Sequence, residues 1–356
     1  MHGPKHPGGT AMEYYAGIDV SLEESHVCVV DGAGKIVREA RVISDPADLV
    51  EFFERLQLPI TRIGLEAGPL SQWLHAGLIR AGLEAVLLET RHVKAALSAM
   101  TVKTDRKDAR GIAHLMRMGW FRPVHAKSAS SQEVRALLVA RKQLQGKLID
   151  VELSIRGILR GFGLKIGKVT RKEFEARVRE LVAGQAMLER IAASMLSARA
   201  TMQNEFNKLH KAMLSIVRSD GVCRKLLTVP GVGPVVAITF RSAVDDPTRI
   251  KKSKAAGALF GLTPKKYQSG ETDVTGGITR VGDEMVRWAL YEAANVMLSR
   301  ATRFLVLKRW AMNVAKRRGM KCAKVALARK LAVVLHRMWV DGSVFRWSKA
   351  KPATAA

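Results

Sequence analysis

Cysteine is scarce in this chain of 356 residues, and the three cysteines that occur are widely separated. Cys28, Cys223 and Cys322 form no C-x-x-C pair, and no histidine lies at zinc-binding spacing from them. These spacings exclude a disulfide framework and a structural zinc site, and they indicate a reducing cytoplasm. Each cysteine is expected to be a small buried side chain.

Long apolar runs and nucleotide-binding loops are also missing. No segment reaches the ~18 uninterrupted apolar residues that a membrane helix needs, and no signal peptide precedes the first periodic segment. We therefore expect a cytoplasmic protein without a membrane partner. The sequence has no G-x-x-x-x-G-K-[ST] loop, so no nucleotide cofactor is expected. Residues 1–12, rich in glycine, proline and histidine, are interpreted as a disordered leader.

Acidic residues are few relative to basic ones. Lys and Arg number 59 against 32 Asp and Glu, which gives a net charge of +27, while 47% of residues are hydrophobic. The net charge is −4 over residues 1–100, +15 over 101–245 and +16 over 246–356. A folded front section with its own carboxylates is thus followed by basic surfaces that suit a polyanion such as nucleic acid.

The front section shows three successive strand patterns followed by alternating helices and strands. Strands are expected at 14–19, 26–31, 35–43, 62–66 and 84–89, and helices at 47–56, 70–81 and onward to about 118. The tight turn Asp31-Gly32-Ala33-Gly34 should join the second and third strands as a hairpin. The order βββαβαβα predicts a mixed sheet with helices on its faces, which is the ribonuclease H-like arrangement.

The rest of the chain has mainly helical patterns. Residues 130–161 and 171–218 predict two long helices, suited to an antiparallel coiled-coil arm or to a simple helical spacer. Two apolar helical segments then flank Pro230-Gly231-Val232-Gly233. This pattern is typical of a helix-hairpin-helix, in which Gly231 and Gly233 let backbone N–H groups approach a phosphate, or of an ordinary helical connection. A glycine-rich loop around 267–277 and helices at 283–299 and 321–338 follow.

Four carboxylates in the front section lie where predicted elements begin or end. Asp19 and Glu66 end strands, and Asp105 and Asp108 open a helix on one face. Neighbouring strands bring their terminal side chains to one edge, and clustered carboxylates repel unless a cation lies between them. The set therefore suits hard divalent ions, Mg²⁺ or Mn²⁺, and two such ions can activate a phosphodiester. The alternatives are a turn residue at Asp19, a surface acid at Glu66 and a helix N-cap at Asp105.

Five segments, in this order, resemble one family of transposases. They are GIDVSLEESHVCVVD, IGLEAGPLSQWL, VKTDRKDARGIAHL, LLTVPGVGPVVA and GLTPKKYQSGE, and the match covers about residues 13–340. The sequence is similar to the DEDD-type transposases of the insertion-sequence one-ten family. The resemblance implies a RuvC-like domain, a coiled-coil linker and a mainly helical C-terminal transposase domain. It also implies an RNA-guided DNA recombinase that uses a structured noncoding bridge RNA.

The resemblance assigns roles to particular residues. The family's four acidic metal ligands fall on Asp19, Glu66, Asp105 and Asp108, and its nucleophilic serine falls on Ser269, which would form a covalent serine–DNA intermediate. Homodimers would pair into a tetramer on donor and target DNA, with a composite site between protomers, at the nucleoid of a prokaryotic cytoplasm. The implied domains are the leader 1–12, the RuvC-like domain 13–125, the helical linker 126–218 and the C-terminal domain 219–350.

Without the resemblance, Ser269 beside Gly270 in a polar loop has the pattern of a common turn residue. A hydroxyl is a poor nucleophile unless a base, a lowered pKa or a metal ion activates it. Lys265 and Lys266 can neutralise a phosphate nearby, and Arg280 either pairs with a phosphate or is a surface arginine.

Three functions remain open at this point. The preferred one is Mg²⁺-dependent excision and insertion of a mobile element by serine attack on DNA and strand exchange, without ATP. The alternative enzyme is a structure-selective nuclease similar to Holliday-junction resolvases, in which the four acids activate water. The third interpretation is an architectural nucleic-acid binder whose acids are structural.

Overall fold

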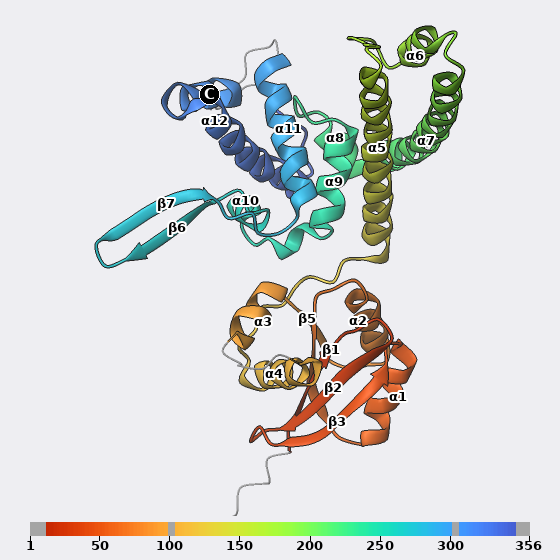
Figure 1. The fold of residues 1–356 in the computed structure, drawn as a ribbon. Coiled ribbons are helices and arrows are strands. Elements are labelled where there is room, and N and C mark those ends of the chain that lie inside the picture. Colours follow the sequence, from red (N-terminus) through yellow and green to blue (C-terminus); the bar gives the residue numbers. More distant parts are fainter. Residues whose placement is uncertain (1–11, 99–103, 301–305, 347–356) are drawn as a thin grey trace, which may run out of the picture. The chain divides into compact units, whose positions relative to one another are not determined.

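The computed structural model describes residues 12–98, 104–300 and 306–346 (Figure 1). Apart from Met12, the predicted leader lies outside these residues. The chain divides into two compact units, Met1–Lys127 and Ser128–Ala356, and each is described by itself. Within the described ranges, no helix combines the length and apolarity that crossing a membrane requires.

The first unit is built on a five-stranded mixed sheet with the strand order β3-β2-β1-β4-β5. Strands β1, β2 and β3 pair antiparallel, while β4 and β5 run parallel to β1. The predicted order βββαβαβα is confirmed, and the strand order is that of a ribonuclease H-like sheet. The elements are β1 (Tyr14–Asp19), β2 (Glu24–Asp31), β3 (Ile36–Ile43), α1 (Pro46–Leu56), β4 (Ile60–Glu66), α2 (Ser71–Arg80), β5 (Ala85–Leu88), α3 (Thr90–Leu97) and α4 (Asp105–Met118).

Helices cover both faces of this sheet because side chains alternate along each strand. On one face, Ala16 and Ile18 of β1 pack with Leu49 of α1 and Leu74 of α2. On the other face, the buried residues of the strands pack against α4, whose Ile112 is fully buried. The central strand β1 is therefore buried on both sides, and its last residue, Asp19, lines a pocket together with the first turn of α4.

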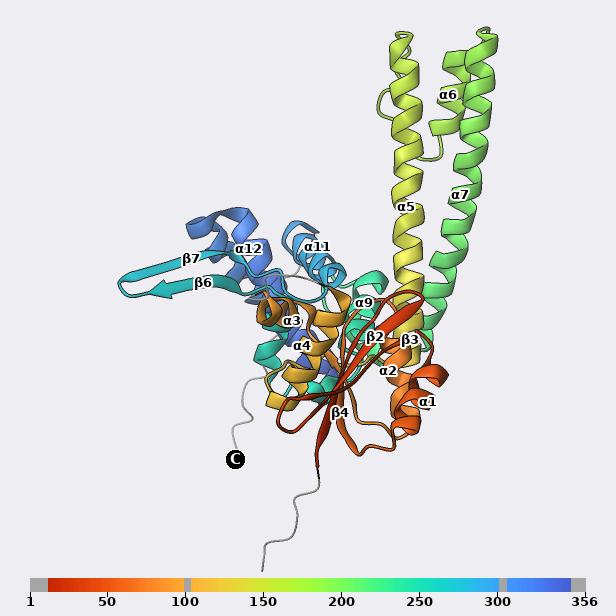
Figure 2. The same ribbon diagram turned by 60° about the horizontal axis from the view of Figure 1, so that its bottom comes forward.

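The second unit begins with an arm of three helices, α5 (Ala129–Gly161), α6 (Phe174–Val182) and α7 (Ala186–Ser219). Figure 2 shows α5 and α7 running side by side, with α6 near the far end of the arm. The prediction of one continuous helix over 171–218 is wrong because the chain breaks between α6 and α7. Gly184 takes a positive φ of 81° there, a conformation that interrupts a right-handed helix.

The base of the arm is anchored by Asp245, which follows α9 (Pro234–Val244). Its carboxylate accepts hydrogen bonds from the Ser128 backbone N–H at 2.9 Å and from the Ser128 and Ser131 hydroxyls at 2.6 Å each. Arg241 donates to the Ser131 hydroxyl at 3.0 Å. The start of α5 is therefore tied to the end of α9 by side-chain bonds that span more than a hundred residues of sequence.

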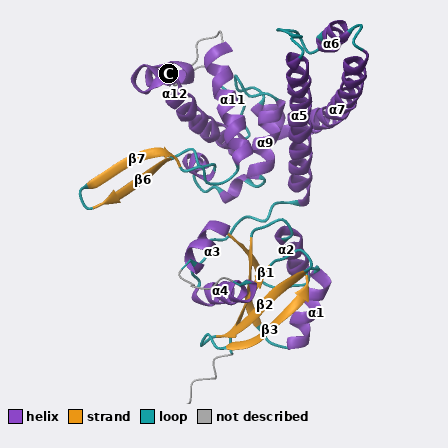
Figure 3. Ribbon diagram, viewed as in Figure 1, coloured by secondary structure: helices purple, strands orange, loops and turns teal. Residues whose placement is uncertain are grey.

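The remaining helices form a buried core to which the base of the arm also contributes, through Leu138 of α5 and Met213 of α7, and one exposed β-hairpin extends from them (Figure 3). The predicted glycine-rich loop around 267–277 is in fact this hairpin, and Cys322, predicted to be buried, is exposed. The long helix α12 bends at Gly319, where φ is 80°. The elements are α8 (Gly221–Leu226), α9, the short turns Pro247–Arg249 and Ser253–Ala255, α10 (Ala256–Leu259), β6 (Pro264–Ser269), β7 (Thr272–Ile278), α11 (Glu284–Arg300) and α12 (Val306–Asp341).

Candidate active site

The four predicted acids line a single pocket in the first unit, with a volume of about 460 Å³. Asp19 is the last residue of β1 and Glu66 the last residue of β4, and these two strands are parallel neighbours. Asp105 and Asp108 lie in the first turn of α4. Four carboxylates from three elements thus face one opening, which we name the acid pocket.

Two glycines let α4 lie directly on the sheet beneath this pocket. Gly17 of β1 and Gly64 of β4 are paired in register. A Cβ at residue 17 would lie 2.2 Å from the Ala109 carbonyl oxygen, and one at residue 64 would lie 2.8 Å from Ile112. At residue 17 the close atoms are backbone atoms, so only glycine permits this helix position there, whereas at residue 64 they belong to the side chains of Ile112 and Met116. This approach sets the first turn of α4 beside the ends of β1 and β4.

Local hydrogen bonds fix the segments that carry the acids. The cap of α4 is Thr104, whose hydroxyl accepts from the Lys107 N–H at 3.3 Å, so the interpretation of Asp105 as the N-cap is wrong. After Glu66, the buried Ser71 hydroxyl donates to the Glu66 carbonyl at 2.5 Å and accepts from the Gly68 N–H at 3.1 Å. These bonds hold the loop that forms one wall of the pocket.

The acids suit a divalent cation in the chemistry of their donors, since carboxylate oxygens are the ligands that Mg²⁺ and Mn²⁺ prefer. Their side chains do not form a ready ligand cluster. Within residues 12–98, 104–300 and 306–346, no three His, Cys, Asp or Glu side chains lie close enough together to hold a metal ion. The pocket therefore offers the right oxygen atoms, and binding an ion requires rotation of these side chains.

Ser269 lies at the end of the exposed hairpin in the second unit. It is the last residue of β6 and pairs with Thr272, so Gly270 and Glu271 alone form the turn. Both strands are exposed along almost their whole length. Within the described part of the chain, the Ser269 hydroxyl has no hydrogen-bonding side chain beside it that could act as a base. The hairpin therefore presents this hydroxyl without activating it.

Three basic residues predicted to meet phosphate lie along or next to the hairpin. Lys265 and Lys266 are exposed on β6, and Lys266 forms an ion pair with Asp273 of β7 at 3.1 Å. Arg280, just beyond β7, is exposed and takes a positive φ of 56°, which is unusual for a side chain other than glycine. The hairpin and its base thus present positive charge to solvent, partly offset by Asp273.

The two glycines of the predicted helix-hairpin-helix differ in their surroundings. Gly231 has a φ of 84°, and a Cβ there would lie 2.4 Å from the Ala293 carbonyl oxygen of α11. A Cβ on Gly233 would meet nothing within 4 Å. Gly231 is thus required for packing between the turn and α11, whereas the space beside Gly233 is open.

Family comparisons cover the two parts of the chain that carry these residues. Residues 16–163 match the DEDD_Tnp_IS110 transposase family, and residues 223–308 match Transposase_20, described as the transposase IS116/IS110/IS902 family. The chain belongs to the IS110 family of transposases. Membership of the IS110 family makes the chain a DNA-cleaving and DNA-joining enzyme by class. The first match contains all four acids, and the second contains Ser269 and the basic residues of the hairpin.

Relatives in the IS110 group match along most of the chain. The transposase for insertion sequence element IS1111A of Coxiella burnetii is 25% identical over 337 residues, which are 93% of this chain and 90% of the relative. The putative transposase y4pF/y4sB of Sinorhizobium fredii is 29% identical over 86% of this chain and 80% of its own length. Among solved structures, Thermus thermophilus RuvC aligns with 32% of this chain and 99% of its own, at 15% identity and a TM-score of 0.24.

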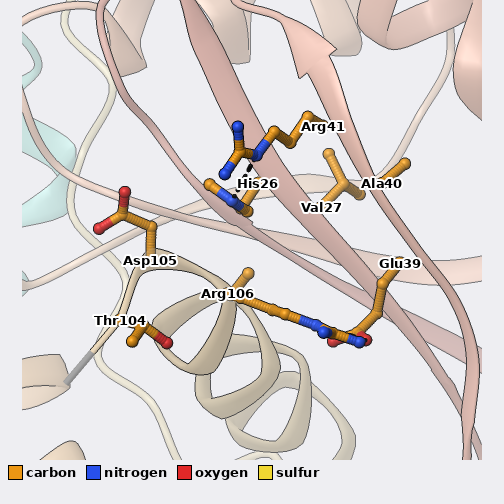
Figure 4. Close-up of a pocket in the computed structure, with 9 residues that line it drawn as sticks. His26, Val27, Glu39, Ala40, Arg41, Thr104, Asp105 and Arg106 are labelled. Carbon is orange, nitrogen blue, oxygen red and sulfur yellow. Dashed lines mark hydrogen bonds and ion pairs between the residues drawn. The ribbon is translucent and has the colours of Figure 1, made fainter. Parts of the chain in front are cut away.

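One group of residues beside the acid pocket was not predicted from the sequence. Glu39 of β3 is held by Arg106 and Arg110 of α4, with Arg106 Nε donating at 2.9 Å and Arg110 Nη2 at 2.8 Å. These two guanidinium groups lower the pKa of Glu39 to about 2, so it stays ionised at neutral pH. Figure 4 shows the contact of Arg106 with Glu39 below a second hydrogen-bonded pair, Arg41 and His26. The predicted hairpin of β2 and β3 was the sequence signal that could have aligned His26 with Arg41.

Proposed function

We propose that this transposase cleaves and rejoins DNA through a serine–DNA intermediate, with a divalent metal ion held by Asp19, Glu66, Asp105 and Asp108. The observation that carries the proposal is the lining of one pocket by these four carboxylates. A bound Mg²⁺ or Mn²⁺ would polarise the phosphodiester and favour ionisation of the attacking hydroxyl. The carboxylates would hold the cation by offering oxygen atoms from two strand ends and one helix start.

The serine step conserves the energy of the broken bond. The Ser269 Oγ loses its proton and forms a bond to phosphorus, the bond from phosphorus to the leaving deoxyribose oxygen breaks, and that oxygen takes up a proton. A hydroxyl of the partner strand then attacks the same phosphorus and releases the serine, which recovers its proton. Because each bond formed replaces one broken, rejoining needs no ATP. The exposed position of Ser269 at a hairpin end, with Lys265 and Lys266 nearby, supports this role.

The charge of the molecule supports nucleic-acid partners for the proposed reaction. The net charge is +27, and its excess lies beyond residue 100. We propose donor and target DNA as substrates, a structured bridge RNA as the guide, and a homodimer that pairs into a tetramer on DNA. Sequencing of RNA that copurifies with the protein tests the guide, because a discrete structured species is expected and its absence contradicts this part of the proposal.

The decisive experiment looks for the covalent intermediate. The protein is incubated with DNA that spans the end of the mobile element in Mg²⁺, denatured, and examined for a protein–DNA adduct. We expect an adduct with the wild type and with Thr272→Ala, which removes a hydroxyl from the residue paired with Ser269, but none with Ser269→Ala. Asp19→Asn and Asp105→Asn should abolish both adduct and cleavage, whereas Glu51→Gln on the surface of α1 should not.

Hydrolysis is the competing outcome, and one observation favours it. Within the described part of the second unit no base contacts Ser269, while the four acids share one pocket in the first unit. If the acids activate water, free nicked ends will form with both the wild type and Ser269→Ala, and no adduct will appear. If Asp19→Asn and Asp105→Asn leave every DNA reaction unchanged, the acids are structural and the protein is an architectural binder.

A further inference from the structure

Three residues form a row across the sheet at the edge of the acid pocket. In the strand register, Asp19 of β1 is paired with His26 of β2, and His26 is paired with Arg41 of β3. Directly paired residues in antiparallel strands point to the same face of the sheet. Two residues further along these strands, Cys28 is paired with Glu39, and this pair belongs to the face of the sheet that α4 covers. Asp19, His26 and Arg41 therefore lie on the same face, in a row that runs from a proposed metal ligand to the edge strand β3.

This row borders a second cavity that adjoins the acid pocket. The cavity has a volume of about 710 Å³, and its lining includes His26, Arg41, Thr104 and Asp105. Asp105 lines both the cavity and the acid pocket. A DNA strand that lies in the acid pocket is therefore next to the second cavity, and Asp105 lies at the boundary between the two. We name the second cavity the arginine pocket.

The arginines near this pocket differ in what neutralises them. Arg106 and Arg110 both contact Glu39, which remains ionised, so part of their charge is offset within the protein. Within residues 12–98, 104–300 and 306–346, Arg41 forms no ion pair with a carboxylate, and its side chain is exposed. Arg41 therefore brings an uncompensated positive charge to a pocket whose neighbour contains four carboxylates.

His26 gives the Arg41 guanidinium a defined direction. The Arg41 Nε–H donates to His26 Nε2 at 3.1 Å, so Nε2 is an acceptor and the ring proton lies on Nδ1 (Figure 4). His26 Nδ1 is buried and has no hydrogen-bond partner within the described residues. Since the bond uses Nε of Arg41, the two terminal nitrogens of the guanidinium remain available to a ligand with paired oxygens.

We propose that Arg41, oriented by His26, binds a phosphate of the DNA strand next to the phosphate in the acid pocket. This proposal rests on the function proposed above, because it assumes that a DNA strand lies in the acid pocket. Four carboxylates repel a polyanion, and one uncompensated guanidinium beside them offsets that repulsion where the strand leaves the acid pocket. Arg41 is thus a DNA-binding residue, and His26 is a positioning residue that acts through it.

The experiment measures DNA binding by the full chain in EDTA, so that neither metal nor catalysis affects the result. The probe is a fluorescent synthetic duplex that spans the junction of element and flanking DNA. Arg41→Ala should raise the Kd about tenfold, the loss of one charge-assisted contact, and lower the slope of log Kd against log salt by about 1. The control is Arg38→Ala, an exposed arginine three residues earlier on β3 that does not line the arginine pocket, which should change Kd less than about twofold.

The contact is located by neutralising single phosphates as methylphosphonates near the cleavage site. Wild-type binding should weaken sharply at one position, and Arg41→Ala should be insensitive at that position alone. His26→Ala should reproduce part of the Arg41→Ala defect, whereas His26→Gln should restore binding because its amide oxygen can accept from Arg41 Nε.

Several results would overturn this inference. They are unchanged binding in Arg41→Ala, an equal loss in Arg38→Ala, or a methylphosphonate pattern that matches the wild type at every position. A defect in RNA binding without one in DNA binding also contradicts it. Failure of the proposed serine chemistry would instead appear as a missing adduct in Mg²⁺ and would leave these binding measurements intact, so the two failures are distinguishable.

Discussion

Replacing Gly17 with alanine tests whether the close approach of α4 to the sheet holds the acid pocket together. A Cβ at residue 17 would lie 2.2 Å from the Ala109 carbonyl oxygen and 2.3 Å from the Ala113 amide nitrogen. Both are main-chain atoms of a helix, so no side-chain rotation can relieve the clash. To reach ordinary contact at 3.4 Å, α4 must move away from β1 by about 1.2 Å.

A shift of this size affects both stability and activity. Overpacking a buried site lowers the free energy of unfolding by about 1–3 kcal/mol, and we expect the upper end because the blocking atoms are backbone. Asp105 and Asp108, which we propose as metal ligands, move with α4, and displacing catalytic groups by about 1 Å lowers a reaction rate about hundredfold. Gly17→Ala should therefore fold with a lower melting temperature and cleave DNA at about 1% of the wild-type rate.

The assay pairs thermal unfolding by circular dichroism with DNA cleavage in Mg²⁺. Gly32→Ala is the matched control, because a Cβ there would meet only the Glu13 carbonyl oxygen at 3.8 Å. This control should retain both the melting temperature and the cleavage rate. If Gly17→Ala also retains both, α4 does not need its close contact with β1, and the account of how the acids are positioned is refuted.

Three further predictions concern a charge contact, a glycine turn and the cysteines. Glu39→Gln should lower the free energy of unfolding by about 2 kcal/mol at pH 7. Because two arginines lower the pKa of Glu39 from 4.5 to about 2, the stabilisation is complete above pH 4.5 and is lost as the pH falls through 2, so denaturant curves of variant and wild type should converge there. Gly231→Ala should lower the melting temperature of the second unit, while Gly233→Ala should not. If both variants instead keep the wild-type melting temperature and bind DNA more weakly, the result supports a phosphate-binding turn. Iodoacetamide at pH 8 should label exposed Cys322 and spare Cys28, whose pKa burial raises to about 11, as intact mass will show.

The first unit could be predicted from the sequence because its signals are local. Alternating apolar residues marked the strands, and the turn at residues 31–34 gave the hairpin between β2 and β3. The ends of β1 and β4 then implied that Asp19 and Glu66 share an edge, and the structure places both in one pocket. Pocket formation also depends on Gly17 and Gly64, whose importance appears only when α4 is placed on the sheet.

The second unit was harder to predict because its decisive contacts are distant in sequence. Gly184 interrupts a helical pattern that otherwise continues from α6 into α7, and a single glycine is often tolerated within a helix. The hairpin of β6 and β7 has no buried face, so it lacks the alternating apolar pattern that marks a strand. The role that we propose for Arg41 was hidden for a similar reason, since it depends on register across three strands.

The anchoring of α5 through Asp245 makes the arm a lever. A helix of 33 residues is about 50 Å long, so a tilt of about 5° at the base displaces the tip by about 4 Å. The hydrogen bonds from Ser128 and Ser131 limit that tilt with short side chains that have little freedom of their own. We therefore expect loss of one hydroxyl at the base to be amplified into a movement of several ångströms at the far end of the arm.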